Sequence, residues 1–324
     1  MVWRVALAIL FAVGLSSQQS APAQYPTKPV HIVVPYPPGG AVDAFARVLS
    51  QQLLEVWGQQ VVVDNRPGAS TMIGAEQVAK APPDGYTLLL TAELTFVTVP
   101  HLYEKIPYDP LRDFAPIIAL VSATQALVVN PSLPIKTVKD LVALAKAKPG
   151  ELTYGSFGNG STGHLNMEML QAMTGTQFNH IPYNGAAPAM NDVIGGHIGF
   201  MFAALSIVKG NVQAGKLRMI GVGSDHRIGE FPDTPTISES GVAGFEAKSW
   251  FGLVAPAGTP KDVIEKINHD VTKVLADRGF AEKYLAPQGL EPIAGTPEAF
   301  AKFIRIETVK WGKVVKDANL SMAK

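Results

Sequence analysis

Short apolar runs alternate with amphipathic segments along the first part of the chain. Runs rich in Val, Ile and Leu occupy residues 30–36, 59–65 and 86–92. Such runs are typical of strands that are buried on both faces of a parallel sheet. Apolar residues recur at helical spacing over 41–57 and 72–81 between them. The pattern therefore predicts alternating strands and helices, which is the signature of an α/β fold.

The same alternation continues through the rest of the chain. We expect further strands at 124–131, 152–156, 178–183, 198–203 and 217–223. We expect further helices at 137–150, 164–174, 186–196, 260–278 and 296–316. Near residues 245–255 the chain should return to its first half.

This organisation predicts two α/β lobes, each a mostly parallel sheet flanked by helices, with a ligand cleft between them. Lobe 1 would contain residues 24–122 plus about 247–324, and lobe 2 residues 123–246. In both lobes a strand ends in a Gly-rich turn that opens onto a helix. Ligands of open α/β sheets bind beyond the carboxyl ends of the strands, so these turns should face the cleft.

Residues 1–23 have the features of a secretory signal peptide. Arg4 precedes the apolar run VALAILFAVGL, and Ala21 and Ala23 supply the small residues that a signal peptidase requires. The run is too short to span a bilayer, and no later segment is apolar and long enough to do so. We therefore expect export to the periplasm, with cleavage after Ala23.

Composition narrows the function further. Lys plus Arg and Asp plus Glu each number 27, and no basic cluster stands out along the chain. Nucleic acid is thus not expected as a partner. The chain has no cysteine, so its core alone must stabilise it, which about 300 residues can do. We expect a monomer without cofactors.

The segment Gly158–Leu165, GNGSTGHL, contains the spacing G-x-G-x-x-G of a dinucleotide-binding turn. That reading requires an acidic residue at the end of the next strand, which instead ends at Tyr183-Asn184. A phosphate-binding loop would require Lys and Ser or Thr where His164 and Leu165 stand. Neither nucleotide site is therefore expected.

Catalytic and metal-binding patterns are also lacking in the sequence. Neither Ser156 nor Ser161 lies in a G-x-S-x-G nucleophile motif, and no nucleophile has a recognisable base partner. The histidines never fall at the i,i+2 or i,i+4 spacing of a metal site. We expect no catalytic residues and no bound metal.

The Gly-rich turns of the two lobes share one further property, which is that each leads into the N-terminus of a helix. A Gly-rich turn allows close approach of a ligand to the backbone, and a helix N-terminus presents free N–H groups and a positive dipole end. The turn Pro37–Ala41 has this character in lobe 1, and residues 67–71 and 184–186 offer further donors. Backbone donors alone can hold a small carboxylate with about micromolar affinity.

Several motifs resemble one known family. YPTKPVHIVVPYPPGGAVDAFAR, LTYGSFGNGSTGHLNMEML, IPYNGAAPAMNDVIGGHI and GLVAPAGTP occur in the order found in extracytoplasmic solute receptors of the tripartite tricarboxylate transporter type, called Bug or TctC-like proteins. The resemblance covers essentially the whole mature chain. It implies a type II-like periplasmic binding-protein fold that closes on its ligand, with integral-membrane transporter subunits as partners. It also implies that the turns matching Pro37–Ala41, Ser156–His164 and Tyr183–Ala187 grip the ligand's carboxylate.

The chain departs from this family at the cleft. His197-Ile198-Gly199 lacks an acidic residue that many members have, and Ala203-Ala204 stands where polar groups are frequent. Glu93 lies just past the third strand, where it is either a solvated loop carboxylate or a group that repels a second carboxylate or pairs with an amine. A less polar lobe 2 favours a monocarboxylate, an aromatic acid or a neutral amide.

The sequence thus predicts a periplasmic receptor that captures a small organic carboxylate and delivers it to a membrane transporter. An exported two-lobed hydrolase and a ligand-sensing receptor without a transport role remain alternatives. Asp43 is open between capping or pairing with the helix dipole and ligand contact, and His164 between capping and ligand contact. The candidate ligand-binding residues are Tyr36, Pro38, Gly39, Gly40, Ala41, Asp43, Ser70, Thr71, Glu93, Ser156, Phe157, Asn159, Gly160, Ser161, His164, Tyr183, Gly185, Ala186 and Ala203.

Overall fold

The computed structural model describes residues 25–317 and 320. The signal peptide expected at residues 1–23 lies outside the described residues and stays a prediction. No helix in the described part of the chain is long and apolar enough to cross a membrane.

Strands and helices alternate as the hydrophobic pattern predicts. The strands are β1 (Val30–Val34), β2 (Val61–Asn65), β3 (Thr87–Ala92), β4 (Phe114–Val129), β5 (Thr153–Ser156), β6 (Asn179–Pro182), β7 (Phe200–Ala204), β8 (Arg218–Val222), β9 (Lys248–Pro256) and β10 (Leu290–Pro292). The α-helices are α1 (Ala41–Trp57), α2 (Met72–Ala79), α3 (Val99–Leu102), α4 (Val138–Ala147), α5 (Thr162–Thr174), α6 (Ala186–Gly195), α7 (Leu205–Gln213), α8 (Lys261–Ala276), α9 (Arg278–Phe280) and α10 (Pro297–Asp317). Three short helical segments complete the chain, namely η1 (Leu94–Thr98), η2 (Ala281–Leu285) and η3 (Ala286–Gln288).

The sheet is mixed rather than mostly parallel. Its strand order is β2-β1-β3-β9-β4-β7-β5-β6, and β8 and β10 also pair with β4. Within each lobe β1 pairs in parallel with β2 and β3, and β5 pairs in parallel with β6 and β7. All pairs that involve β4 or β9 are antiparallel. Strands β4 and β9 carry the chain between the lobes. They run in opposite directions because β4 takes the chain from lobe 1 to lobe 2 and β9 brings it back.

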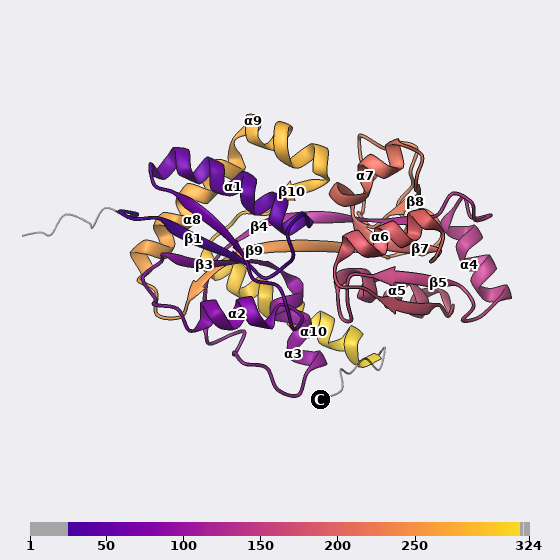
Figure 1. The fold of residues 1–324 in the computed structure, drawn as a ribbon, viewed down its shortest axis with the longest axis horizontal. Coiled ribbons are helices and arrows are strands. Elements are labelled where there is room, and N and C mark those ends of the chain that lie inside the picture. Colours follow the sequence, from indigo (N-terminus) through magenta and orange to yellow (C-terminus); the bar gives the residue numbers. More distant parts are fainter. Residues whose placement is uncertain (1–24, 318–319, 321–324) are drawn as a thin grey trace, which may run out of the picture.

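Figure 1 shows two lobes joined by β4 and β9. Phe114–Thr124 of β4 pairs with β9, whereas Gln125–Val129 pairs with β7 and β8. The boundaries expected near residues 122 and 247 fall within β4 and just before β9. These exact boundaries stay predictions.

Apolar side chains form a core on each face of the sheet. In lobe 1, α1 and α8 cover one face, and α2 and α10 contribute to the cluster on the other. In lobe 2, α4 and α5 pack on one face, and α6 and α7 on the other. Leu165 of α5 belongs to the lobe 1 cluster that includes Trp250 and Trp311, so α5 also contacts lobe 1.

Several elements differ from the expectation, and η2, η3 and β10 were not expected at all. The segment 94–102 is helical although it is rich in β-branched residues and contains Pro100. Helix α7 was not expected because it follows β7 directly and contains Gly210. Strand β4 begins ten residues before the expected 124, since Pro116 reads as a strand breaker and is accommodated here by a register shift.

Candidate functional site

The turn after β1 is held by a buried carboxylate at the start of α1. Asp43 is 3% exposed, and its Oδ2 accepts a hydrogen bond from the Gly39 amide at 2.9 Å. Its Oδ1 accepts from Asn65 Nδ2 at 2.9 Å and pairs with the Arg47 guanidinium at 2.9 Å. Burial alone would raise the pKa of Asp43, but hydrogen bonds from Arg47, Gly39 and Asn65 outweigh it and lower the pKa below its usual value. Asp43 is therefore engaged within lobe 1 and holds the turn that precedes α1, without capping the helix itself.

The backbone amides that follow Gly39 have no hydrogen-bond acceptor among the described residues. Gly40 is the N-cap of α1 and receives no side-chain cap, and within the described residues the amides of Gly40, Ala41 and Val42 have no hydrogen-bond acceptor. Gly39 adopts φ +84°, a left-handed conformation that favours glycine. The first turn of α1 thus presents unpaired N–H groups at the positive end of the helix.

The glycine turn of lobe 2 is bonded mainly within itself. The Gly160 amide donates to Nδ1 of His164 at 3.0 Å, and Ser161 Oγ donates to the Gly158 carbonyl at 2.6 Å. Gly158 and Gly160 have φ values of +132° and +71°. Two of the expected ligand donors, Gly160 and Gly39, are therefore already paired.

Helix α5 still begins with unpaired groups. Ser161 is its N-cap without a side-chain cap, and no described residue accepts from the amides of Thr162 or Gly163. The side chain of Asn159 also has no hydrogen-bond partner among the described residues and is partly exposed. These groups remain available to a ligand.

Two stacked histidines, His164 and His180, contact the glycine turn of lobe 2. The rings of His164 and His180 lie 3.9 Å apart, and His180 Nε2 is 2.6 Å from Ser156 Oγ. Burial, followed by the charge of His164, lowers the pKa of His180 to about 4. His164 Nδ1 accepts from Gly160, so its other nitrogen carries the proton and faces Glu168 at 3.6 Å. His164 thus acts as a support of the turn.

The sequence did not identify His180 as part of the site. In the structure β5 and β6 pair in parallel and bring His180 opposite Tyr154. Two residues along β5, Ser156 then comes within hydrogen-bond distance of the imidazole. Only the strand register makes this pair, and the register is not visible in the spacing of the residues.

The turn before α6, at residues 183–185, lies close to Pro37 of lobe 1. The Tyr183 amide donates to the Ser156 carbonyl at 3.0 Å, which places this turn beside the glycine turn. Gly185 is the uncapped N-cap of α6, and its open side lies 3.8 Å from Pro37 of lobe 1, measured from an ideal Cβ position. Within the described chain the amides of Gly185 and Ala186 have no acceptor. The α6 N-terminus therefore adds a third set of free donors.

The remaining candidates lie in different surroundings. Tyr183 Oη donates to Asp192 at 2.5 Å, and burial followed by that bond raises its pKa to about 12. Ser70 Oγ is paired with Tyr103 at 2.8 Å, and Thr71 Oγ1 accepts from Thr95 at 2.9 Å. The hydroxyls of these candidates are thus committed within the protein.

Tyr36, Pro38 and Phe157 line the two opposing turns. The Tyr36 hydroxyl is buried without a hydrogen-bond partner among the described residues. Pro38 is exposed, and Phe157 is half-buried with its ring beside Gly163. By contrast, Ala203 is 0% exposed and its side chain belongs to a lobe 2 core cluster.

Glu93 is not a solvated loop residue, and that alternative was wrong. The side chain is 1% exposed and accepts hydrogen bonds from Thr162 Oγ1 and from Ser249 Oγ. Burial raises the pKa of Glu93, although these hydrogen bonds act in the opposite direction. Glu93 therefore connects the start of α5, through Thr162, with strand β9, through Ser249.

The described residues contain no group of three or more His, Cys, Asp or Glu side chains arranged to hold a metal. The arrangement at the cleft is instead three helix N-termini, from α1, α5 and α6, with unpaired amides. Chemically, such a set can accept an anion without any lysine or arginine.

The family model described as tripartite tricarboxylate transporter family receptor, TctC, matches residues 45–320. The chain belongs to this receptor family. The resemblance inferred from the sequence is confirmed, and the protein is a periplasmic solute-binding receptor of the TctC/Bug type.

Individual relatives match this receptor over nearly their whole length. Protein BugT of Bordetella pertussis is 36% identical over 310 residues, covering 95% of this chain and 94% of BugT. The structure of R. palustris Rpa4515 with adipate has a TM-score of 0.89 and 37% identity, covering 92% of this chain and all of that chain. MatC from Rhodopseudomonas palustris with bound malate has a TM-score of 0.82 and 26% identity, covering 90% of this chain and all of that chain.

Proposed function

We propose that this receptor captures a small organic carboxylate in the cleft and delivers it to an integral-membrane transporter. The observation that carries the proposal is the set of unpaired amides at the N-termini of α1, α5 and α6. These groups come from both lobes, so a ligand that contacts them stabilises the closed arrangement by its differential affinity for it.

The magnitudes are sufficient. A hydrogen bond to a charged group contributes about 1.5–3 kcal/mol, and a helix N-terminus about 0.3–2 kcal/mol. Five such donors, less association costs of several kcal/mol, leave about 8 kcal/mol, which corresponds to a micromolar Kd. The free amides of Gly40, Ala41 and Val42 supply three of these donors.

The ligands of related structures support an organic acid. Rpa4515 carries adipate and MatC carries malate. A preference for a monocarboxylate depended partly on Glu93 facing the ligand. Because its carboxyl group is bonded to Thr162 and Ser249, we propose the broader class of small organic carboxylates.

A thermal-shift panel tests this class. It would contain mono-, di- and tricarboxylates, aromatic acids and the corresponding amides. An acid at 100 times its Kd should stabilise the protein by about 2.7 kcal/mol, whereas its amide should give a much smaller shift. Equal shifts from acids and amides, or none from any acid, would contradict the proposal.

A proline substitution tests the donors themselves. Ala41→Pro removes one free amide at the first position of α1, where proline is tolerated because Gly40 is already extended. We expect Ala41→Pro to bind the acid with about tenfold lower affinity and to keep its fold. Lys261→Pro makes the same change at the first position of α8, away from the cleft, and should leave the response unchanged. Equal affinity of Ala41→Pro and the unaltered receptor would count against these donors.

One observation favours a hydrolase as a second candidate. Ser156 Oγ and His180 Nε2 lie 2.6 Å apart, as a nucleophile and its base would. Ser156 is however 0% exposed, and its hydroxyl also lies 3.0 Å from the Gly158 carbonyl. We therefore propose a binding role and no enzymatic activity. A fluorophosphonate probe should not label Ser156, and labelling that disappears in Ser156→Ala would establish the hydrolase instead.

We propose a transporter rather than a sensor as the membrane partner, and a monomeric receptor. Light scattering of the purified protein tests the monomer. Uptake of the bound acid into proteoliposomes that contain the membrane subunits tests delivery. Ligand-dependent activation of a sensor without uptake would favour the alternative.

A further inference from the structure

Glu93 is a buried carboxyl group of lobe 1 that contacts lobe 2. It directly follows β3, and its Oε1 accepts a hydrogen bond from Thr162 Oγ1, at the first residue of α5. Its Oε2 accepts from Ser249 Oγ at 2.5 Å and lies 3.4 Å from the Trp250 amide. One carboxyl group therefore joins lobe 1, the connecting strand β9 and the helix that begins at the glycine turn.

The lobes also come close to one another at two other positions. An ideal Cβ on Gly160 would lie 2.0 Å from Leu102 Cδ1, and one on Gly185 would lie 3.8 Å from Pro37. Both contacts cross from lobe 2 to lobe 1, so the structure represents a closed arrangement. The bond between Glu93 and Thr162 is a further contact between the lobes.

We propose that Glu93 is a proton-operated latch, in which closure places a protonated carboxyl group between Thr162 and Ser249 and opening releases the proton to solvent. A protonated carboxyl group donates one hydrogen bond and accepts others, so both hydroxyls can remain partners. The inference rests on the proposed function, because the closure that it regulates is the one that captures the ligand.

The surroundings of Glu93 contain few other titratable groups. The segment after β1 contributes the Tyr36 phenol, whose pKa is raised chiefly by burial. On α5, His164 is bonded to Gly160, and Glu168 is bonded to Tyr154. On β9, Lys248 is paired with Asp225 at 2.9 Å. Within the described chain no cation is paired with Glu93, so burial is not offset by an opposite charge.

The sign of the pH effect follows from this environment. Opening, in this proposal, exposes Glu93 to water and returns its pKa toward the ordinary value of 4.5. In the closed receptor burial raises the pKa. The proton therefore binds the closed form more tightly, and the ratio of closed to open receptor falls by up to about tenfold per pH unit as the pH rises from the open-state value to the closed-state value.

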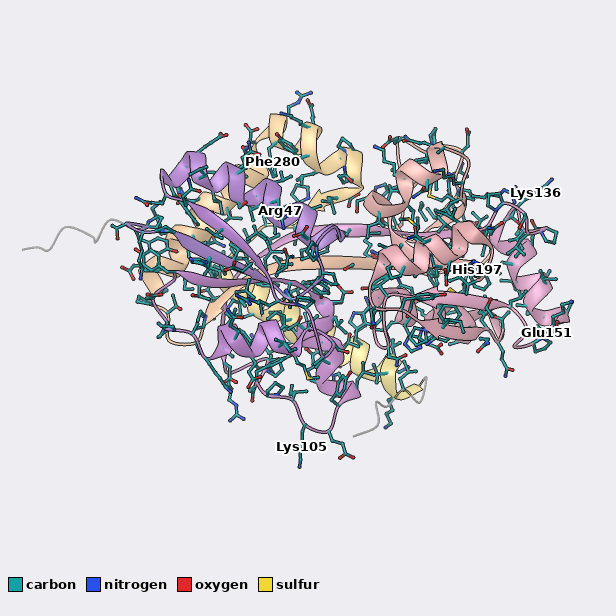
Figure 2. All side chains as sticks on the ribbon, in the orientation of Figure 1. Arg47, Lys105, Lys136, Glu151, His197 and Phe280 are labelled. Atoms are coloured by element: carbon teal, nitrogen blue, oxygen red, sulfur yellow. The ribbon has the colours of Figure 1, made fainter. Side chains whose placement is uncertain are left out.

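Interlobe distance measurements test the latch without any ligand. The chain has no cysteine, so Lys105→Cys and Lys136→Cys introduce the sole attachment sites for spin labels. Figure 2 shows Lys105 on lobe 1 and Lys136 on lobe 2, and both are exposed. We expect the closed fraction to fall as the pH rises above the ordinary glutamate range. Glu93→Gln is uncharged at every pH, and its closed fraction should stay constant over that range.

Matched variants on α5 separate the latch from a general loss of stability. Thr162→Val removes the hydroxyl and should reduce the closed fraction at all pH values, whereas Thr162→Ser keeps it and should restore the pH profile. A closed fraction that rises with pH would overturn the proposal. A profile of Glu93→Gln that matches the unaltered receptor would overturn it as well. Failure of the acid panel, in contrast, would reject the proposed ligand class and leave these distance profiles unaffected.

Discussion

Gly39 and Gly40 are adjacent residues with different hydrogen-bonding states. The Gly39 amide is paired with Asp43, whereas no described residue accepts from the Gly40 amide. The same distinction separates Gly160, which is paired with His164, from Thr162 at the start of α5. At the residue scale, buried side chains thus shape each turn and leave the next amides free for a ligand.

Asp43 should be essential for the shape of the first turn. Replacing it by alanine removes a 3% exposed carboxylate that has Gly39, Arg47 and Asn65 as partners. We expect Asp43→Ala to lower the free energy of unfolding by about 2–3 kcal/mol, because buried partners are left unsatisfied. The acid response should weaken with it.

Asp43→Asn is the matched control for this change. It keeps a side-chain oxygen for the Gly39 amide but loses the charge that pairs with Arg47. Urea unfolding and the thermal-shift panel measure both variants. If Asp43→Ala bound the acid as tightly as the unaltered receptor, the turn would not depend on this carboxylate.

The sequence was informative about turns but not about individual partners. The PPGGA and GNGSTG segments identify the two Gly-rich turns, since glycine is required at the positive φ of Gly39 and Gly160. Which amides are free depends on contacts such as that of His164 with Gly160. The burial of Glu93 depends on Ser249, far along the chain. Such contacts arise only when the chain is folded, so no local pattern contains them.

At the scale of elements, the glycine turn before α5 packs against α3 of the other lobe. An ideal Cβ atom on Gly160 would lie 2.0 Å from Leu102 Cδ1. Leu102 is 4% exposed. A methyl group there is compatible with an open receptor but clashes with Leu102 in the closed one. We expect Gly160→Ala to weaken acid binding by at least about tenfold.

The other end of α5 provides the control. Gly175 has φ +64°, close to the +71° of Gly160, but nothing lies within 4 Å of its ideal Cβ position. Both alanine variants should lose about 1–2 kcal/mol of stability from the left-handed conformation. Calorimetric titration should show weaker binding for Gly160→Ala alone. Equal affinities of the two variants would mean that closure does not use this contact.

The regular elements were predictable where local pattern and tertiary structure agree. Helix α1 was expected at 41–57 and lies at Ala41–Trp57, because its apolar positions match the helical period. The helix at 94–102 opposes its own propensity and is stabilised by packing against α10 and neighbouring segments. The antiparallel pairing of β4 with β9 joins residues more than a hundred positions apart, which periodicity does not encode.

At the scale of the whole molecule, the two lobes are joined by strands β4 and β9 (Figure 1) and meet further at the turns before α5 and α6. Helix α10 packs chiefly on lobe 1, where its Phe300 and Trp311 join the same core cluster as Leu165 of α5. In the proposed function, ligand capture changes how the lobes meet, with the donors of α1 on one side and those of α5 and α6 on the other.

The most direct measurement is a crystal structure of the receptor with the acid that gives the largest shift in the panel. We predict carboxylate oxygens within about 2.7–3.2 Å of the amides of Gly40, Ala41 and Val42, with further contacts from the first amides of α5 or α6. An acid bound elsewhere, or one that places no acceptor oxygen at these amides, would contradict the account.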